Sequence, residues 1–133
     1  MKTLIRTFLG AALLLGAAAA NADVVVIVSA KSTASTMTAE DVANIYLGKS
    51  SAMKPVDNAT PVRSQFYTKV AGKDEAQVKA IWSKLVFTGK ATPPKELSSS
   101  ADVVKAVAAD PNAIGYVDKT AVDGSVKVVY DVK

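Results

Sequence analysis

The sequence contains no cysteine and no histidine among its 133 residues. Without cysteine no disulfide can form, so the fold must be held together by packing alone. The two absences also remove the commonest ligands of transition metals and two common catalytic groups. The sequence has no Asp-rich loop with the spacing of a calcium site either. We therefore expect no metal site and no cofactor.

Further absences weigh against catalysis and against nucleic-acid binding. There is no Gly-x-Ser-x-Gly motif, and no histidine could serve as the base for a nucleophilic serine. The acidic pairs Glu40-Asp41 and Asp74-Glu75 are explained by their positions at expected helix starts. Basic residues are spread singly along the chain, with no clustered stripe. We predict that the protein is not an enzyme and does not bind nucleic acid.

The N-terminal residues have the features of a signal peptide. Lys2 and Arg6 precede the apolar stretch Phe8 to Gly16, and Ala20-Asn21-Ala22 provides the small-x-small pattern of a cleavage site. A membrane-spanning helix needs about 20 apolar residues, and this stretch is shorter. The pattern predicts that residues 1–22 are cleaved, that the mature protein is periplasmic, and that it does not insert into the membrane.

The mature chain, residues 23–133, has the length of a single domain. Removal of Lys2 and Arg6 leaves 14 basic and 12 acidic residues, so the formal net charge falls from +4 to +2. The high isoelectric point of the whole sequence therefore does not indicate a nucleic-acid partner.

Hydrophobic patterns predict the secondary structure of the mature chain. The β-branched run from Asp23 to Ser29 is typical of a strand buried on both faces. Further strands are expected around Val56, over Ile114–Val117 and over Val126–Val132. Helices are expected between Thr38 and Gly48, over Ser64–Ala71, between Asp74 and Thr88, and from Ser98–Ser100 to Asp110. This order predicts an α/β fold in which helices cover a small sheet.

Apolar side chains at helical spacing predict the core. The clearest amphipathic helix follows Asp74, and its apolar face comprises Val78, Ile81, Trp82, Leu85 and Val86. The aromatic side chains of Tyr46, Phe66 and Trp82 are also expected in the core rather than stacked on a ligand. The dispersed lysines are interpreted as a solvated face: Lys49, Lys54, Lys84, Lys90 and Lys95.

Two segments are candidates for contact with an anion. The loop after the first strand carries Ser29, Lys31, Ser32 and Thr33, whose hydroxyls and ammonium could converge where a strand ends. A solvated linker is the alternative interpretation of this loop.

The second candidate is the pair Arg63 and Ser64. Ser64 is expected to cap a helix whose N-terminus points toward the Ser29 loop, and Arg63 would add a bidentate donor. The alternative is an ordinary cap beside a surface arginine. Tyr116 could place a hydroxyl near the same cleft, although core packing is the favoured explanation of its position.

Three stretches together resemble the phosphate-binding proteins of ABC importers. Thr38–Lys49 is similar to a helix that leads into an Ile-aromatic-x-Gly-Lys segment, and Val107–Val117 is similar to a segment that ends in Ala-Ile-Gly-Tyr-Val. Ile81–Lys90 with Pro93-Pro94 resembles a compact secreted subfamily. The resemblance implies about one lobe of a type II periplasmic-binding-protein-like fold, whereas full-length relatives close two lobes around the anion.

The resemblance implies two functions. In the first, the protein captures a small oxyanion such as phosphate through Ser/Thr hydroxyls, backbone donors, Arg63 and Ser64. The family's acidic residue and Gly-Thr are missing from Thr60–Phe66, and only Arg63 and Ser64 match the family pattern. In the alternative, the single lobe is an accessory or protein-interaction subunit of an envelope assembly and has lost ligand capture.

Overall fold

The computed structural model describes residues 23–132. The predicted signal peptide therefore lies outside the described residues. No helix within residues 23–132 combines the length and the apolar character that a membrane crossing requires.

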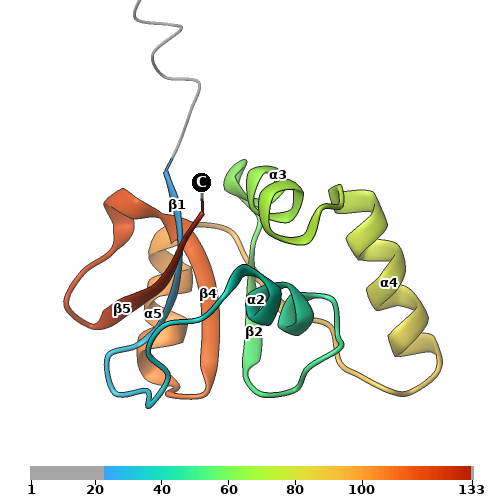
Figure 1. Ribbon diagram of the computed structural model, residues 1–133, viewed down its shortest axis with the longest axis horizontal. Coiled ribbons are helices and arrows are strands. Elements are labelled where there is room, and N and C mark those ends of the chain that lie inside the picture. The colour runs from blue at the N-terminus through green and yellow to red at the C-terminus, as the bar shows by residue number, and fades with distance from the viewer. Residues whose placement is uncertain (1–22, 133) are drawn as a thin grey trace, which may run out of the picture.

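The described residues form a five-stranded sheet with helices on both faces (Figure 1). In chain order the elements are β1 (Val24–Ser29), α2 (Ala39–Tyr46), β2 (Lys54–Asn58), α3 (Val62–Phe66), the π-helical turn η1 (Tyr67–Ala71), α4 (Glu75–Phe87), β3 (Lys95–Leu97), α5 (Ser100–Ala109), β4 (Ala113–Asp118), the 3₁₀ turn η2 (Lys119–Ala121) and β5 (Val126–Val132). The predicted α/β class and helix-covered sheet are confirmed. The short strand β3 was not predicted.

The directions of the strands determine where each loop lies. The strand order is β3-β2-β4-β1-β5. β2 runs parallel to both β3 and β4, whereas β1 runs antiparallel to both β4 and β5. The carboxyl end of β1 therefore lies at the opposite end of the sheet from the carboxyl end of β2.

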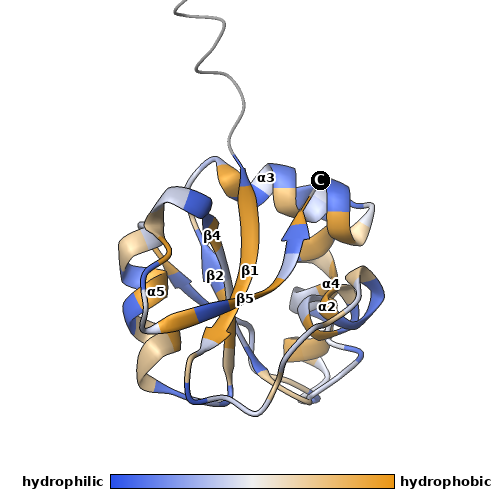
Figure 2. Ribbon diagram, turned by 60° about the vertical axis from the view of Figure 1, so that its left-hand side comes forward, coloured by the Kyte–Doolittle hydropathy of each residue, from blue (hydrophilic) through white to orange (hydrophobic). Residues whose placement is uncertain are grey.

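β1 is the centre of two hydrophobic cores. Its alternate residues Val24, Val26 and Val28 belong to the core beneath α2, α3 and α4, whereas Val25 and Ile27 belong to the core beneath α5. This alternation follows from the two-residue period of a strand. Figure 2 shows β1 as a continuous hydrophobic strip between α5 on one side and α2 on the other. The prediction that the first strand is buried on both faces is confirmed.

Aromatic side chains fill the core beneath α2 and α3. The rings of Phe66 and Tyr116 stack with their centroids 3.9 Å apart, and Tyr46 meets Phe66 edge-on at 4.9 Å. Trp82 donates from its indole nitrogen to the carbonyl oxygen of Tyr46 at 2.7 Å. Tyr46, Phe66 and Trp82 are buried, which confirms their predicted role in the core.

Side chains at the helix ends explain why the helices begin where they do. Thr38 accepts from the N–H of Asp41, whose carboxylate accepts from the N–H of Thr38; this pair forms a capping box. Asp74 and Gln77 form a second capping box at the start of α4. Gly48 follows α2 with a φ of +77°, a conformation that favours glycine.

The apolar face predicted for α4 is only partly covered. Val78 and Trp82 are buried, and Ile81 and Leu85 pack partly against the core. Val86, however, is exposed, and so is the neighbouring Phe87. The C-terminal turn of α4 thus presents apolar side chains that the described residues leave uncovered.

Candidate functional site

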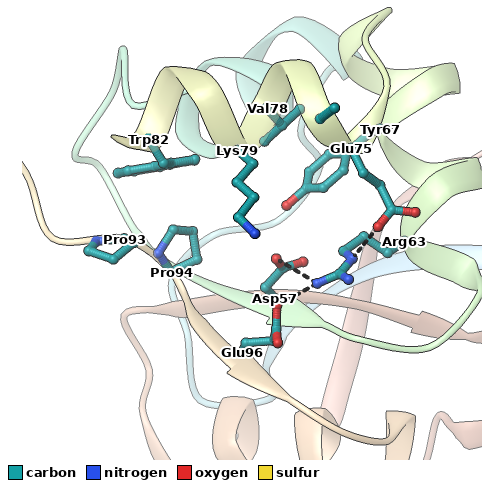
Figure 3. A pocket seen from close by; sticks show the side chains of 11 residues that line it. Asp57, Arg63, Tyr67, Glu75, Val78, Lys79, Trp82, Pro93, Pro94 and Glu96 are labelled. Carbon is teal, nitrogen blue, oxygen red and sulfur yellow. Dashed lines mark hydrogen bonds and ion pairs between the residues drawn. The ribbon is translucent and has the colours of Figure 1, made fainter. Parts of the chain in front are cut away.

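A pocket of about 310 Å³ lies at the carboxyl end of β2 (Figure 3). We call it the β2 pocket. Side chains from β2, α3, η1, α4, the connector before β3 and β3 line it. Five of them are charged: Asp57, Arg63, Glu75, Lys79 and Glu96. The other lining residues are Tyr67, Ala76, Val78, Trp82, Pro93 and Pro94.

Arg63 is at the centre of an ion-pair cluster in this pocket. Its Nε donates to Oε1 of Glu75 at 2.8 Å, and its Nη1 donates to Oε2 of Glu96 at 2.5 Å. The same Nη1 lies 3.6 Å from Oδ2 of Asp57. These contacts are the dashed lines in Figure 3. Partial burial acts to lower the pKa of Arg63, but the three carboxylates outweigh it and raise this pKa above its usual value.

Four separate elements supply the members of the cluster. Asp57 lies near the end of β2, and Arg63 lies in the first turn of α3. Glu75 is the first residue of α4, and Glu96 is the middle residue of β3. From Asp57 to Glu96 these elements span 40 residues of the chain, so the guanidinium links segments that are distant in the sequence.

Asp57 is also tied to the aromatic core. Its Oδ1 accepts hydrogen bonds from the Tyr116 hydroxyl and, at 2.9 Å, from the N–H of Asn58. Burial raises the pKa of Tyr116 and of Tyr67, and the negative charge of Asp57 raises both further. The ring of Tyr116 packs in the core, and its hydroxyl bonds to Asp57, which lines the pocket; Tyr116 itself is fully buried and does not line it.

The charge of the β2 pocket does not favour a small anion. Its lining carries three carboxylates against one guanidinium and one ammonium. The positive charge of Arg63 is already balanced by carboxylates at hydrogen-bond distance. A phosphate-like ion beside Arg63 would have to displace these carboxylates or lie against them, and like charges at this range repel.

The Ser29 loop uses its hydroxyls internally. The Ser29 hydroxyl donates to the carbonyl oxygen of Ala108 at 3.3 Å and accepts from the N–H of Lys31 at 3.1 Å. The Ser32 hydroxyl accepts from the N–H of Ala34 at 3.1 Å. The side chains of Lys31 and Thr33 are exposed. These bonds shape a tight turn in which two of the predicted hydroxyls are engaged within the protein.

The structure does not bring the two predicted segments together. The Ser29 loop follows β1, whereas Arg63 and Ser64 follow β2, at the opposite end of the sheet. The expectation that the helix after β2 points toward the Ser29 loop is therefore wrong. The reason is that β1 runs antiparallel to β2, which the hydrophobic pattern of a strand does not reveal.

The predicted helix cap at Ser64 is also wrong. α3 begins at Val62 with Pro61 before it, and no side chain caps this end. Ser64 lies within the first turn and is exposed. Whether Ser29, Lys31, Ser32, Thr33, Arg63 or Ser64 contacts a ligand stays a prediction.

Sequence reasoning missed the acidic partners of Arg63. Asp57 directly follows the centre of the short strand expected around Val56, Glu75 is explained by an expected helix start, and Glu96 lies on the strand β3, which was not predicted. One signal was present: Asp57 directly follows the apolar Val56 of the expected short strand, where polar residues often line a site. Glu75 and Glu96 carried no comparable signal. Within residues 23–132, no group of three or more His, Cys, Asp and Glu side chains is placed to hold a metal ion.

Comparison with known proteins identifies the fold. No model of a protein family matches the sequence, and no curated protein matches it. Among solved structures, the chain is similar to a putative phosphate ABC transporter substrate-binding protein with bound phosphate from Clostridium perfringens, with a TM-score of 0.65 and 19% identity over 81% of this chain and 44% of that one.

Two further structures give the same result. An ABC-type phosphate transport receptor from Vibrio cholerae matches with a TM-score of 0.63 and 15% identity, over 81% of this chain and 45% of that one. PstS from Borrelia burgdorferi matches with a TM-score of 0.61 and 12% identity, over 82% and 47%. The chain thus spans about half the length of these structures. It has the fold of about one lobe of a phosphate ABC transporter substrate-binding protein.

Proposed function

We propose that the mature chain is a periplasmic, non-enzymatic module that binds another protein of the cell envelope, and that it does not capture a free oxyanion. The fold supports a binding role, since it is that of one lobe of transport receptors. The export pattern of residues 1–22 supports the envelope location. Whether the ligand is a protein or an oxyanion is inferred from the ion pairs that Arg63 forms within the chain.

The ion pairs of Arg63 with carboxylates of the same chain are the main support for this proposal. A buried oxyanion needs donors on all sides to replace its hydration. Here the guanidinium that would provide the main donor is held by Glu75 and Glu96 and lies beside Asp57. The hydroxyls of Ser29 and Ser32, which would have joined it, lie at the far end of the sheet and have partners there. The protein-binding function is therefore favoured over oxyanion capture.

Calorimetric titration of the mature protein, residues 23–133, with phosphate and with sulfate tests the first half of the proposal. We expect no binding tighter than about 1 mM, a weak affinity of about −4 kcal/mol. Tight binding that disappears in an Arg63→Ala variant, or in a Lys31→Ala variant, would instead support oxyanion capture. A Lys79→Ala variant is the matched control, since Lys79 lines the same pocket without an ion pair among the described residues.

Photo-crosslinking in intact cells tests the second half. A photoreactive amino acid is placed at exposed positions distributed over the surface, one position for each variant. We expect at least one position to give a discrete adduct with another envelope protein. If no position gives an adduct, the protein-binding function is refuted, whatever the calorimetry shows.

A further inference from the structure

A second cavity, of about 740 Å³, lies beside the β2 pocket. We call it the edge groove. It runs along the start of β2 and beneath the connector from Lys90 to Pro94. Trp82, Pro93 and Pro94 line both the edge groove and the β2 pocket, so these three side chains form the wall between the two.

The edge groove exists because β3 is short. β3 pairs with β2 only from Val56 onward, so Lys54 and Pro55 have no strand beside them on that side in the described residues. Met53, Pro55 and Ala91 instead contribute apolar surface to the groove. Pro55 has no N–H to donate to an added strand. The groove therefore suits the insertion of a side chain better than the addition of a strand to the sheet.

Uncovered apolar side chains precede the groove in the chain. Phe87 is 91% exposed and Val86 is 45% exposed, both on the last turn of α4. Three residues later the chain reaches Lys90, which lines the groove. A single exposed phenylalanine needs no explanation by itself. Here it lies three residues before the connector that forms one side of an apolar groove, and exposed apolar side chains near such a groove are typical of a protein-binding surface.

The charges around the groove are mostly positive. Three lysines and one carboxylate line it: Lys54, Lys90, Lys95 and Asp110. The Lys54 Nζ lies 3.5 Å from Oδ2 of Asp110. Neither Lys90 nor Lys95 forms an ion pair with any residue in the range 23–132. Two unpaired ammonium groups beside an apolar groove favour an acidic occupant.

The same charges argue against a second copy of this chain. Phe87, which would have to enter the groove of the other copy, lies between Lys84 and Lys90 in the sequence. Its insertion would bring these lysines toward Lys90 and Lys95 of the other copy, and such like-charge contacts are destabilising. An anionic membrane surface matches the charge, but it is flat and would leave the concave groove unfilled.

We propose that the edge groove docks a segment of a partner protein that carries an aromatic or aliphatic side chain flanked by Asp or Glu. The apolar side chain enters the groove, and the acidic residues meet Lys90 and Lys95. Phe87 and Val86 extend the contact along α4. This assignment rests on the proposed function and adds the surface and the chemistry of the partner.

Site-specific photo-crosslinking in cells that make the full chain tests the assignment. A photoreactive residue replaces Phe87 or Met53, and the exposed Val128 on β5 serves as the comparison position. We expect adducts from positions 87 and 53 and none from 128. Mass spectrometry of the crosslinked peptide should identify an apolar residue with neighbouring acidic residues.

Charge reversal then tests the role of the lysines. The double variant Lys90→Glu/Lys95→Glu should reduce the adduct from position 87 at least about tenfold. The matched double variant Lys69→Glu/Lys119→Glu reverses two exposed lysines that do not line the groove and should leave the yield unchanged. All four lysines are exposed, and thermal unfolding of both variants checks that the fold is retained.

The outcomes separate this assignment from the proposed function. Adducts from Val128 but not from positions 87 and 53 would overturn the groove assignment and leave the protein-binding function intact. No adduct from any position would overturn both. An adduct with lipid, with a second copy of the chain or with a basic segment would overturn the assignment, as would full yield in the Lys90→Glu/Lys95→Glu variant.

Discussion

Replacement of Arg63 by methionine should destabilise the mature protein. Methionine keeps part of the apolar stem of the side chain but removes the charge and all the donors. Three carboxylates then share one end of the sheet without the guanidinium that holds them together: Asp57, Glu75 and Glu96. Their mutual repulsion and the loss of the hydrogen bonds both act against the folded state.

The magnitude follows from the exposure of each partner. Loss of a fully buried partner costs about 3–5 kcal/mol, whereas an exposed ion pair contributes about 0–1 kcal/mol. The Asp57 side chain is 14% exposed, so its contribution lies toward the buried limit, but the Tyr116 hydroxyl still donates to it. Glu75 and Glu96 are 43% and 59% exposed and belong to the exposed class. We expect a total loss of about 2–3 kcal/mol.

Urea unfolding followed by fluorescence measures this loss, because Trp82 is the single tryptophan of the chain. The expected shift of the midpoint is about 1–2 M urea for a domain of this size. In the double-mutant cycle of Arg63→Met with Asp57→Asn, the arginine replacement should cost at least about 1 kcal/mol less when residue 57 is uncharged. Lys79→Met is the control, with an expected change below about 0.5 kcal/mol. An Arg63→Met variant as stable as the parent, or a coupling near zero, would refute the reasoning.

Two further predictions concern the core. Gly115→Ala should cost about 1–3 kcal/mol of stability in the same assay, because the added Cβ would lie 2.6 Å from Cγ1 of Val103, a stiff β-branched side chain on α5; a neutral effect would contradict this close approach of β4 and α5. Burial raises the pKa of three tyrosines, which are Tyr46, Tyr67 and Tyr116. Since the unfolded chain releases these protons near pH 10 and the folded chain keeps them, their contribution to stability is complete below about pH 10 and falls above it by about 1.4 kcal/mol per pH unit for each tyrosine. The chain has four tyrosines. Tyrosinate absorbance of more than one tyrosine that appears before unfolding, in a titration to high pH, would contradict this prediction.

The sequence predicted the local structure well because local interactions determine it. Thr38 and Asp74 satisfy backbone donors within three residues, so their capping roles are visible in a short window of sequence. The β-branched run of β1 and the apolar positions of α5 likewise depend on neighbours in the sequence. The order of these elements predicted the α/β class, and the family resemblance, carried by three motifs in the right order, then predicted about one lobe of a type II periplasmic-binding-protein-like fold.

The candidate site was harder to predict because it depends on strand direction and on contacts distant in the sequence. An apolar run identifies a strand but does not say whether the strand runs parallel or antiparallel to its neighbours. The Ser29 loop and Arg63 were therefore expected at one cleft and lie at opposite ends of the sheet. Arg63 meets Glu96 across 33 residues, and that contact requires β3, a strand too short to produce a pattern.

The two charged regions beside Trp82 have different physical roles, which follow from whether their partners lie within the chain. Arg63 has carboxylate partners within the chain at hydrogen-bond distance. These ion pairs connect α3, α4 and β3 and are expected to stabilise the folded chain. Lys90 and Lys95 have no such partners among residues 23–132, so their ammonium groups can form ion pairs with the acidic side chains of another molecule. One of the similar solved structures has bound phosphate. In this chain we instead assign Arg63 to stability and the unpaired positive charge to a different surface. The chemistry that decides binding in this protein is then expected at the edge groove rather than at the β2 pocket.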